Sequence, residues 1–279
     1  MKSAAQRLAL RYALPVVAVT LFFSIRHCGQ PRQKPAGQPR DYADIVRQGT
    51  LRATTEYNSV SFYVNGDSIA GFHYELIRAF ARDKGLKAEI TPLMSVDDRL
   101  KGLADGRFDI IAYNILSTDQ LRDSLLLTSP ILLNRQVLVQ RKATAENDST
   151  YIHSQLELAG KTVSVVRNSP AIPRIRHLGE EIGDTIYVSE VERYGPEQLI
   201  DMVAHGDIDY AVCDEGIARA VLDSFPQLDM RTAIGFTQFY SWAVSKRSPV
   251  LLDSLDRWLE RFKPSAEYRR IYREYYGKE

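Results

Sequence analysis

The fold is decided by the stretch Gly71-Phe-His-Tyr-Glu-Leu-Ile-Arg-Ala-Phe80, which follows a short β-rich segment, Leu51–Thr55, and a loop rich in aromatic residues. Its apolar side chains recur at helical spacing, so one face of the predicted helix is built for burial. Gly85 can adopt the left-handed conformation that commonly ends a helix, and the residues after it alternate as in a strand. This order predicts a strand, a crossover helix and a parallel strand.

The same stretch resembles the signature of the extracellular solute-binding proteins that serve polar amino acids. The shared pattern is Gly-Phe-x-x-Glu-Leu-x-x-x-Phe-Ala after a Leu-Arg-x-x-Thr strand, and His73 departs from it because the family usually has an acid there. The C-terminal pattern Tyr-x-x-Ile-x-x-x-Tyr-Tyr-Gly resembles the last helix of that family, so the resemblance covers residues 41–277. It implies an α/β, two-lobed periplasmic-binding-protein fold, in which each lobe is a mostly parallel sheet flanked by helices and a two-stranded hinge joins the lobes.

An internal similarity also indicates two lobes. Residues 100–114 align with residues 200–214, and each segment ends in a polar side chain, Asn114 or Asp214, after an apolar run. The alternative interpretation is that helix–glycine–strand units look alike in any α/β protein. If the segments are equivalent, both side chains lie at strand ends beside a shared crevice, where open α/β sheets bind ligands.

The predicted domain organisation has four parts. Two β-rich runs, Val137–Gln140 and Phe239–Ser245, are the predicted crossings between the lobes. The parts are residues 1–27 (signal anchor or signal peptide), 28–40 (linker), 41–135 with 241–279 (lobe 1) and 138–238 (lobe 2).

The N-terminal segment combines basic residues with the apolar run Ala13–Ile25, a length that suits the core of a signal peptide. No small-x-small cleavage site follows, and Arg26 and His27 before Cys28 do not suit lipid attachment. An uncleaved anchor, a lipidated cysteine and ordinary cleavage therefore all stay open. A location on the periplasmic side of a bacterial membrane, with this segment as anchor, is implied mainly by the family resemblance.

The charge distribution argues against a nucleic-acid partner. Residues 1–40 carry seven Lys and Arg and no acid, which leaves 29 basic against 35 acidic residues in the rest of the chain. The predicted folded part is therefore acidic, which is a poor complement to a phosphate backbone. The two cysteines, Cys28 and Cys213, are far apart in sequence and predict no disulfide within the chain.

Candidate ligand-binding residues come from two sources. Besides Asn114 and Asp214, the run Arg167-Asn168-Ser169-Pro170 is a good helix start, where free backbone N–H groups could hold an anion such as a carboxylate. Ordinary helix capping is the alternative for Asn168, Ser169 and Asp214.

The family resemblance adds roles and further candidates. It implies that Asp214 binds the α-ammonium of an amino acid and that Arg122, after the loop containing Ser117 and Thr118, binds its α-carboxylate. Tyr57 and Phe62 would then form an aromatic wall. Ser117 to Arg122 is one residue longer than the usual pattern, which rotates a helical side chain by about 100° and leaves a surface position open for Arg122.

The function expected from the sequence is binding without catalysis. The chain shows no nucleophile elbow, no metal-spaced His/Glu pair and no glycine-rich phosphate loop, so we expect neither cofactor nor metal. The pattern also resembles the N-terminal binding module of the membrane-bound lytic transglycosylase F family.

We therefore expect a membrane-tethered protein that closes around an amino acid, a short peptide or a cell-wall fragment, for transport or regulation, with a membrane transporter or a cell-wall enzyme as protein partner. An enzyme on the same scaffold (dehydratase-like or transglycosylase-related) and a non-binding scaffold are the alternatives.

Overall fold

The computed structural model describes residues 37–117, 119–144, 149–192 and 194–277. The predicted signal segment, Cys28 and most of the predicted linker lie outside these residues, as does Thr118. Across the described ranges, no helix is both long enough and apolar enough to cross a membrane.

The first sheet has the strand order β4-β1-β5-β13-β6, and β7 also pairs with β13. β1 runs parallel to β4 and β5, as expected from the crossover, whereas β13 is antiparallel to β5, β6 and β7. Its strands are β1 (Thr50–Thr55), β4 (Lys87–Pro92), β5 (Ile110–Leu116), β6 (Leu125–Leu127), β7 (Leu132–Asn134) and β13 (Gln238–Ser245).

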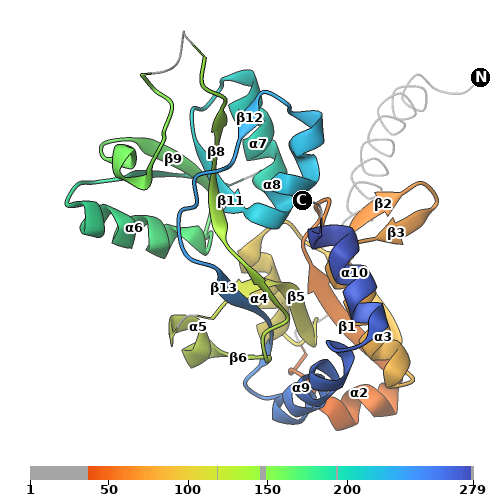
Figure 1. Cartoon of the computed structure of the whole chain (residues 1–279). Helices are drawn as coiled ribbons and strands as arrows, with labels where there is room; N and C mark the ends of the chain where they lie inside the picture. The colour runs from red at the N-terminus through yellow and green to blue at the C-terminus, as the bar shows by residue number, and fades with distance from the viewer. Residues whose placement is uncertain (1–36, 118, 145–148, 193, 278–279) are drawn as a thin grey trace, which may run out of the picture. The chain divides into compact units, whose positions relative to one another are not determined.

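The second sheet has the order β10-β9-β11-β8-β12, and a separate hairpin, β2–β3, extends from the first-sheet region (Figure 1). β9 is parallel to β10 and β11, and β8 is antiparallel to β11 and β12. The strands are β2 (Tyr63–Asn65), β3 (Ser68–Ala70), β8 (Gln136–Arg141), β9 (Thr162–Val166), β10 (Tyr187–Val191), β11 (Ala211–Asp214) and β12 (Leu228–Asp229).

Helices flank both sheets. α3, α9 and α10 lie around the first sheet, and α6, α7 and α8 around the second (Figure 1). Their bounds are α2 (Tyr42–Gln48), α3 (Phe72–Asp83), α4 (Val96–Ala104), α5 (Asp119–Ser124), α6 (Ala171–Ile182), α7 (Pro196–His205), α8 (Glu215–Val221), α9 (Pro249–Phe262) and α10 (Ala266–Tyr276), with short 3₁₀ turns η1 (Gln155–Leu158) and η2 (Leu222–Ser224).

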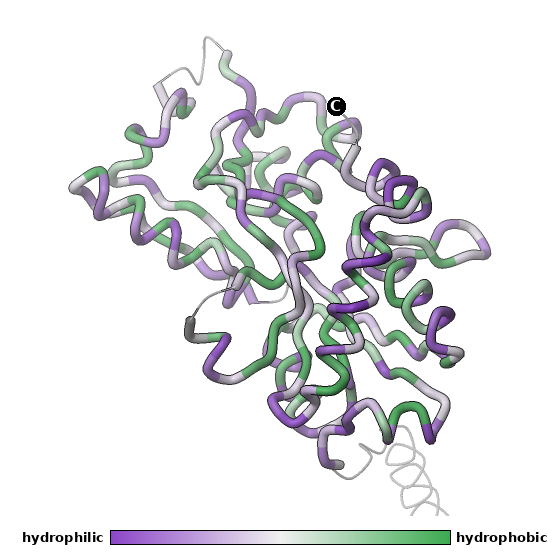
Figure 2. Tube along the Cα trace, turned by 60° about the horizontal axis from the view of Figure 1, so that its bottom comes forward, coloured by the Kyte–Doolittle hydropathy of each residue, from purple (hydrophilic) through white to green (hydrophobic). Residues whose placement is uncertain are grey.

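The helix predicted from the stretch Gly71–Phe80 is α3, and its side chains Phe72, Leu76 and Phe80 are completely buried. Hydrophilic and hydrophobic segments alternate along the helices, as expected for helices with one buried face (Figure 2). α3 begins after Gly71, which has φ 136°, and a Cβ there would lie 2.4 Å from the carbonyl oxygen of Ser61. Only glycine fits both this conformation and this close approach.

Two crossing segments connect the sheets. β13 belongs to the first sheet and β8 to the second, and the Gln136 side-chain amide donates a hydrogen bond of 2.8 Å to the hydroxyl of Tyr240. One cluster of buried apolar side chains includes Trp242 from the first sheet and Val137 from the second. The crossings therefore lie side by side and are packed together.

The apolar run before Asn114 forms a strand that continues past this residue. β5 covers Ile110–Leu116, so Asn114 lies within the strand and not just beyond its end. The parallel pairing to β1 involves Ile110 and Ile111, while pairing to β13 continues to Leu116. The antiparallel crossing strand thus extends β5 past the edge of the parallel sheet.

The predicted linker is shorter than residues 28–40. The compact unit begins at Gln38, and Arg40 is buried, where its guanidinium forms an ion pair with the carboxylate of Asp109. The Ser248 hydroxyl also donates a hydrogen bond of 2.7 Å to the Arg40 carbonyl. These contacts are long-range, which is why the Pro-rich composition of this segment did not indicate them.

Candidate ligand-binding site

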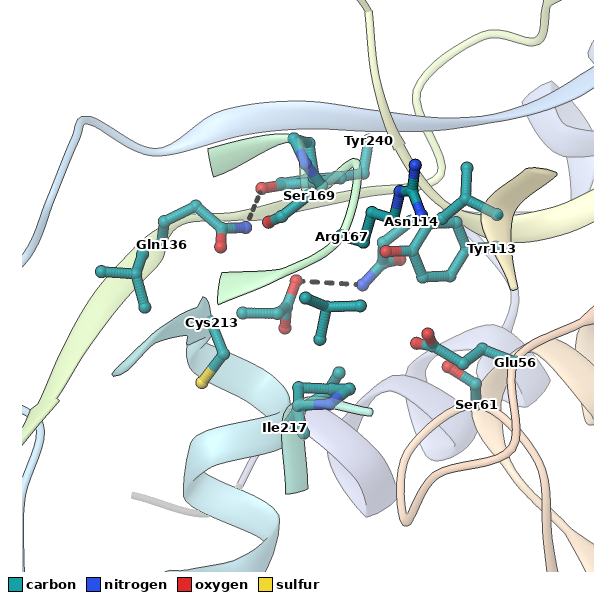
Figure 3. Close-up of a pocket in the computed structure, with 16 residues that line it drawn as sticks. Glu56, Ser61, Tyr113, Asn114, Gln136, Arg167, Ser169, Cys213, Ile217 and Tyr240 are labelled. Atoms are coloured by element: carbon teal, nitrogen blue, oxygen red, sulfur yellow. Dashed lines mark hydrogen bonds between the residues drawn. The ribbon is translucent and has the colours of Figure 1, made fainter. Parts of the chain in front are cut away.

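A small cavity lies where strand ends of the two sheets meet, and its volume is about 40 Å³ (Figure 3). A volume of this size holds a few water molecules. The lining residues are Glu56, Ser61, Val96, Tyr113, Asn114, Gln136, Val166, Arg167, Ser169, Pro170, Pro196, Val212, Cys213, Asp214, Ile217 and Tyr240.

Asp214 is the last residue of β11 and its carboxylate is buried. Oδ1 accepts hydrogen bonds from the side chain of Asn134 at 2.6 Å and from the backbone N–H of Gly216 at 3.0 Å. Oδ2 accepts from Asn114 Nδ2 at 3.2 Å. The bond to Gly216 makes Asp214 the N-cap of α8, and the bond to Asn114 connects the second sheet to the first.

Burial raises the pKa of Asp214 to about 6, although the hydrogen bonds from Asn114 and Asn134 act in the opposite direction. Within the described part of the chain, no cationic side chain forms an ion pair with this carboxylate. A buried carboxylate without a cation is costly, and a cation beside it favours the ionised form. The site is therefore electrostatically suited to a positively charged ligand group.

Glu56 is the second buried carboxylate of the cavity. It follows β1 directly and accepts a hydrogen bond of 2.9 Å from Asn58 Nδ2. Burial raises the pKa of Glu56 despite the opposing effect of Arg99, whose guanidinium lies 3.8 Å away. Arg99 Cζ also lies 4.5 Å from the centre of the Tyr113 ring. Arg99 thus lies beside Glu56, whereas Asp214 has no ion-pair partner among the described residues.

Comparison with known sequences assigns the chain to a family. Residues 51–278 match the profile of the bacterial extracellular solute-binding proteins, family 3. The chain belongs to this family. A curated relative, the membrane-bound lytic murein transglycosylase F of Desulfosudis oleivorans, is 30% identical over 234 residues, which are 83% of this chain and 50% of the relative. The chain therefore spans about half the length of the curated relatives it matches.

Solved structures show the same fold. A mutant of ArgBP from T. maritima superposes with a TM-score of 0.71 at 22% identity, over 85% of this chain and 99% of that one. An ancestral arginine-binding protein bound to arginine gives a TM-score of 0.70 at 24% identity, over 82% and 99%. The predicted fold class, the two-lobed α/β fold of periplasmic binding proteins, is thus confirmed. The parallel pairing, however, is confined to three strands in each sheet.

Four of the predicted site residues line the cavity of this solute-binding protein: Asn114, Arg167, Ser169 and Asp214. The guanidinium of Arg167 is ion-paired with Glu192. The Ser169 hydroxyl accepts a hydrogen bond of 3.2 Å from the N–H of Ala171 at the start of α6. The capping interpretation and the cavity-lining interpretation therefore both apply to Ser169, as they do to Asp214.

The structure does not bring the predicted aromatic wall to the cavity. Tyr57 is 47% exposed, and Phe62 is buried against Tyr74 at a ring-centre distance of 5.6 Å. A backbone bridge between Asn58 and Phe62 turns this loop back on itself. Because the loop folds locally, its aromatic rings pack on one another and on α3.

Arg122 also lies away from the cavity walls. It is exposed, and its Nε donates a hydrogen bond of 2.7 Å to the hydroxyl of Ser117, which likewise is not a lining residue. The extra residue between Ser117 and Arg122 is consistent with this surface position. Asn168 is exposed too, with φ 57°, and its side-chain amide donates to Asp97 at 3.1 Å. Thr118 lies outside the described residues.

Sequence reasoning missed Glu56, Gln136 and Tyr240. Glu56 directly follows a predicted strand, so the rule that ligands bind at the carboxyl ends of strands could have found it. Gln136 and Tyr240 lie on the two crossing segments, whose mutual contact becomes visible only in the tertiary structure. Among the described residues, no group of three or more His, Cys, Asp or Glu side chains could hold a metal ion.

Proposed function

We propose that this family member is a periplasmic binding protein for a small ligand that carries a positively charged amino or guanidinium group. The observation that carries the proposal is the buried Asp214 carboxylate, which lines the cavity and has no cationic partner among the described residues. A ligand cation at this position would compensate the buried charge.

The other cavity walls favour an amino acid or a short peptide. Ser169 and Pro170 place the N-terminus of α6 at the cavity, and Arg167 is beside it. Backbone N–H groups at a helix N-terminus stabilise a carboxylate. A zwitterion would therefore meet negative charge at Asp214 and positive potential at α6. The arginine bound to one structural relative has this combination of charged groups.

Binding requires the lobes to separate, because a cavity of about 40 Å³ is too small for an amino acid. Besides the bonds of Asp214 to Asn114 and Asn134, two further hydrogen bonds link the lobes. Glu197 accepts one from the Ser59 backbone N–H at 2.7 Å, and Asp97 accepts one from Asn168 at 3.1 Å. We propose that the crossings β8 and β13 act as the hinge for this movement.

We further propose that the protein binds its ligand without turnover, tethered to the membrane by its N-terminal segment. The name of the curated relatives, lytic murein transglycosylases, favours a cell-wall fragment with a free amino group as a second ligand class. With either ligand, the protein would deliver the bound molecule to a transporter or regulate a cell-wall enzyme.

The test is a thermal-shift panel at about pH 7.5 with L-arginine, L-lysine, L-glutamine, a cell-wall stem peptide and agmatine, which lacks the α-carboxylate of arginine. Titration calorimetry then compares the wild type with Asp214→Asn. Asparagine still caps α8 but carries no buried charge, so at this pH we expect the variant to be at least as stable as the wild type and to bind with an affinity lower by about 2–5 kcal/mol.

Asp209→Asn is the matched control. Asp209 lies before the same strand, and its carboxylate is exposed and pairs with Arg141. This variant should bind like the wild type. Equal affinities of wild type and Asp214→Asn would remove Asp214 from the site. Chemical conversion of the ligand during incubation would instead show an enzyme.

A further inference from the structure

A buried chain of hydrogen bonds extends from Asp214 into the first lobe. Trp242 Nε1 donates to His73 Nδ1 at 3.0 Å, and His73 Nε2 lies 3.0 Å from Asn114 Oδ1. Asn114 Nδ2 donates to Asp214 Oδ2 at 3.2 Å. Trp242, His73 and Asn114 are all buried. This series of hydrogen bonds thus joins the crossing strand β13, helix α3, strand β5 and the carboxylate of Asp214 at the cavity.

The donor and acceptor atoms of these side chains determine the direction of each hydrogen bond in the series. The indole N–H of Trp242 is a donor only, so His73 Nδ1 must be the acceptor. A neutral imidazole then carries its proton on Nε2, which donates to Asn114. The amide oxygen of Asn114 must therefore face His73, and its nitrogen must face Asp214. A doubly protonated imidazole would place two donors against each other at Trp242.

The remaining hydrogen-bonding capacity of Asn114 is also used. Its Nδ2 donates at 3.1 Å to the hydroxyl of Tyr276 on α10, in addition to Asp214. The Asp214 oxygens are held from the other side by Asn134 and by the N–H of Gly216. Asn114 consequently has one favourable orientation, and that orientation fixes Asp214 Oδ2 at the cavity wall.

We propose that His73 is a positioning residue of the ligand site, which holds the Asn114 amide with its nitrogen toward Asp214 and thereby orients the carboxylate for a ligand cation. This inference rests on the proposed function, although the orientation itself exists without ligand. His73 touches neither the cavity nor Asp214, so its effect passes through Asn114.

Several other groups influence the charge of Asp214 from the surrounding elements. Glu56 after β1 faces it across the cavity, and burial raises the pKa of Glu56 as well. The remaining titratable neighbours that sense the Asp214 charge are Tyr113 on β5, Cys213 on β11, Tyr240 on β13 and Tyr276 on α10, and burial raises the pKa of each. None of these groups changes in the variants used below.

The experiment compares His73→Gln with His73→Met, which have similar shape. Glutamine retains an N–H donor near the Nε2 position, whereas methionine has no donor. The first measurement is the carboxyl pKa of Asp214 in the ligand-free protein, followed by carbon-13 NMR. We expect His73→Gln to resemble the wild type and His73→Met to bind a proton at Asp214 about tenfold more tightly, because Asn114 no longer holds its donor in place.

The second measurement is L-arginine affinity by calorimetry, which should fall about tenfold in His73→Met and be retained in His73→Gln. A purely structural role would lower the melting temperature of both variants and leave the two Asp214 titrations alike, and that result would overturn the proposal. If His73→Met does not fold, Trp242→Phe is used instead. Phenylalanine cannot donate to His73, so this variant removes the first hydrogen bond of the series and should also raise the pKa of Asp214.

If the wild type does not bind L-arginine, the proposed ligand is wrong, but the proposal for His73 is not affected. The Asp214 titrations of the two His73 variants still decide whether His73 positions Asn114.

Discussion

At the scale of single residues, Asp214 has two roles that a sequence presents as alternatives. One oxygen caps α8 through Gly216, and the other accepts from Asn114 at the cavity. Because a carboxylate has about four acceptor sites, one residue can cap a helix and still bind a cation. The capping interpretation therefore does not exclude the ligand-binding one.

The raised pKa of Asp214 makes a prediction about stability and pH. The group has a pKa of about 6 in the folded protein against a reference value of 3.8. An acid whose folded pKa is raised holds more protons in the folded state between these values, so stability falls as pH rises through this window. About two pKa units correspond to about 3 kcal/mol.

The measurement is urea unfolding of wild type and Asp214→Asn at several pH values from about 3.5 to 7. The wild type should lose about 3 kcal/mol relative to the variant across this range. Glu56 is present in both proteins, so only the part of its titration that depends on the Asp214 charge remains in the difference. A difference that does not change with pH would show that burial does not raise the Asp214 pKa.

At the scale of elements, the start of α3 connects two helices that are far apart in the sequence, α3 and α10. The Gly71 N–H donates to the hydroxyl of Tyr275 at 2.9 Å, and that hydroxyl donates to Glu75 at 2.7 Å. Helix α10 is thus attached to the first turn of α3. Residues distant in sequence depend on the backbone conformation of a single glycine.

Gly71→Ala tests this dependence, with Gly85→Ala as the matched control. Gly85 also has a positive φ of 65°, but nothing lies within 4 Å of a Cβ added there, whereas a Cβ at position 71 meets the Ser61 backbone at 2.4 Å. Gly85→Ala should cost about 1–2 kcal/mol, from backbone conformation alone.

Gly71→Ala should cost clearly more, about 4 kcal/mol or above, because strain and a backbone clash add. Urea unfolding curves of the two variants provide the comparison. If both variants lose a similar amount of unfolding free energy, the loop before α3 adjusts to the added Cβ at little cost.

At the scale of the whole folded unit, the closed arrangement depends on a few polar contacts between the lobes. Glu197 at the start of α7 binds the backbone of Ser59, and Asp97 at the start of α4 binds Asn168. Hydrogen bonds to a charged group contribute about 1.5–3 kcal/mol each. Removing one should therefore shift the balance between closed and open forms measurably.

Glu197→Ala should shift the ligand-free protein toward the open form by about tenfold or more. The control is Glu192→Ala, because Glu192 is exposed and pairs with Arg167 of the same lobe. Distances between spin labels on α4 and α7 report the populations. Identical distance distributions for Glu197→Ala and the control would show that this contact does not stabilise closure.

Much of the fold could be predicted because its signals are local. The apolar spacing of Phe72, Leu76 and Phe80 determined α3, and Ser95 accepts a hydrogen bond from the N–H of Asp98 as a helix cap should. Of the site, Asn114 and Asp214 could be predicted from their places after apolar runs, without any ligand in view. Such signals depend on residues within about one helical turn or one strand, so the sequence displays them directly.

What the sequence by itself determined is therefore the first strand–helix–strand unit, the two crossing strands and the two central polar residues of the cavity. Only the tertiary structure decided that Asn134 and Gln136 join them, that Arg122 stays at the surface, and that His73 orients Asn114. Asn114 and Asp214 are 100 residues apart, and Trp242 is 169 residues from His73. Contacts at such separations arise from the packing of whole strands and helices, and periodicity along the chain carries no information about which ends will meet.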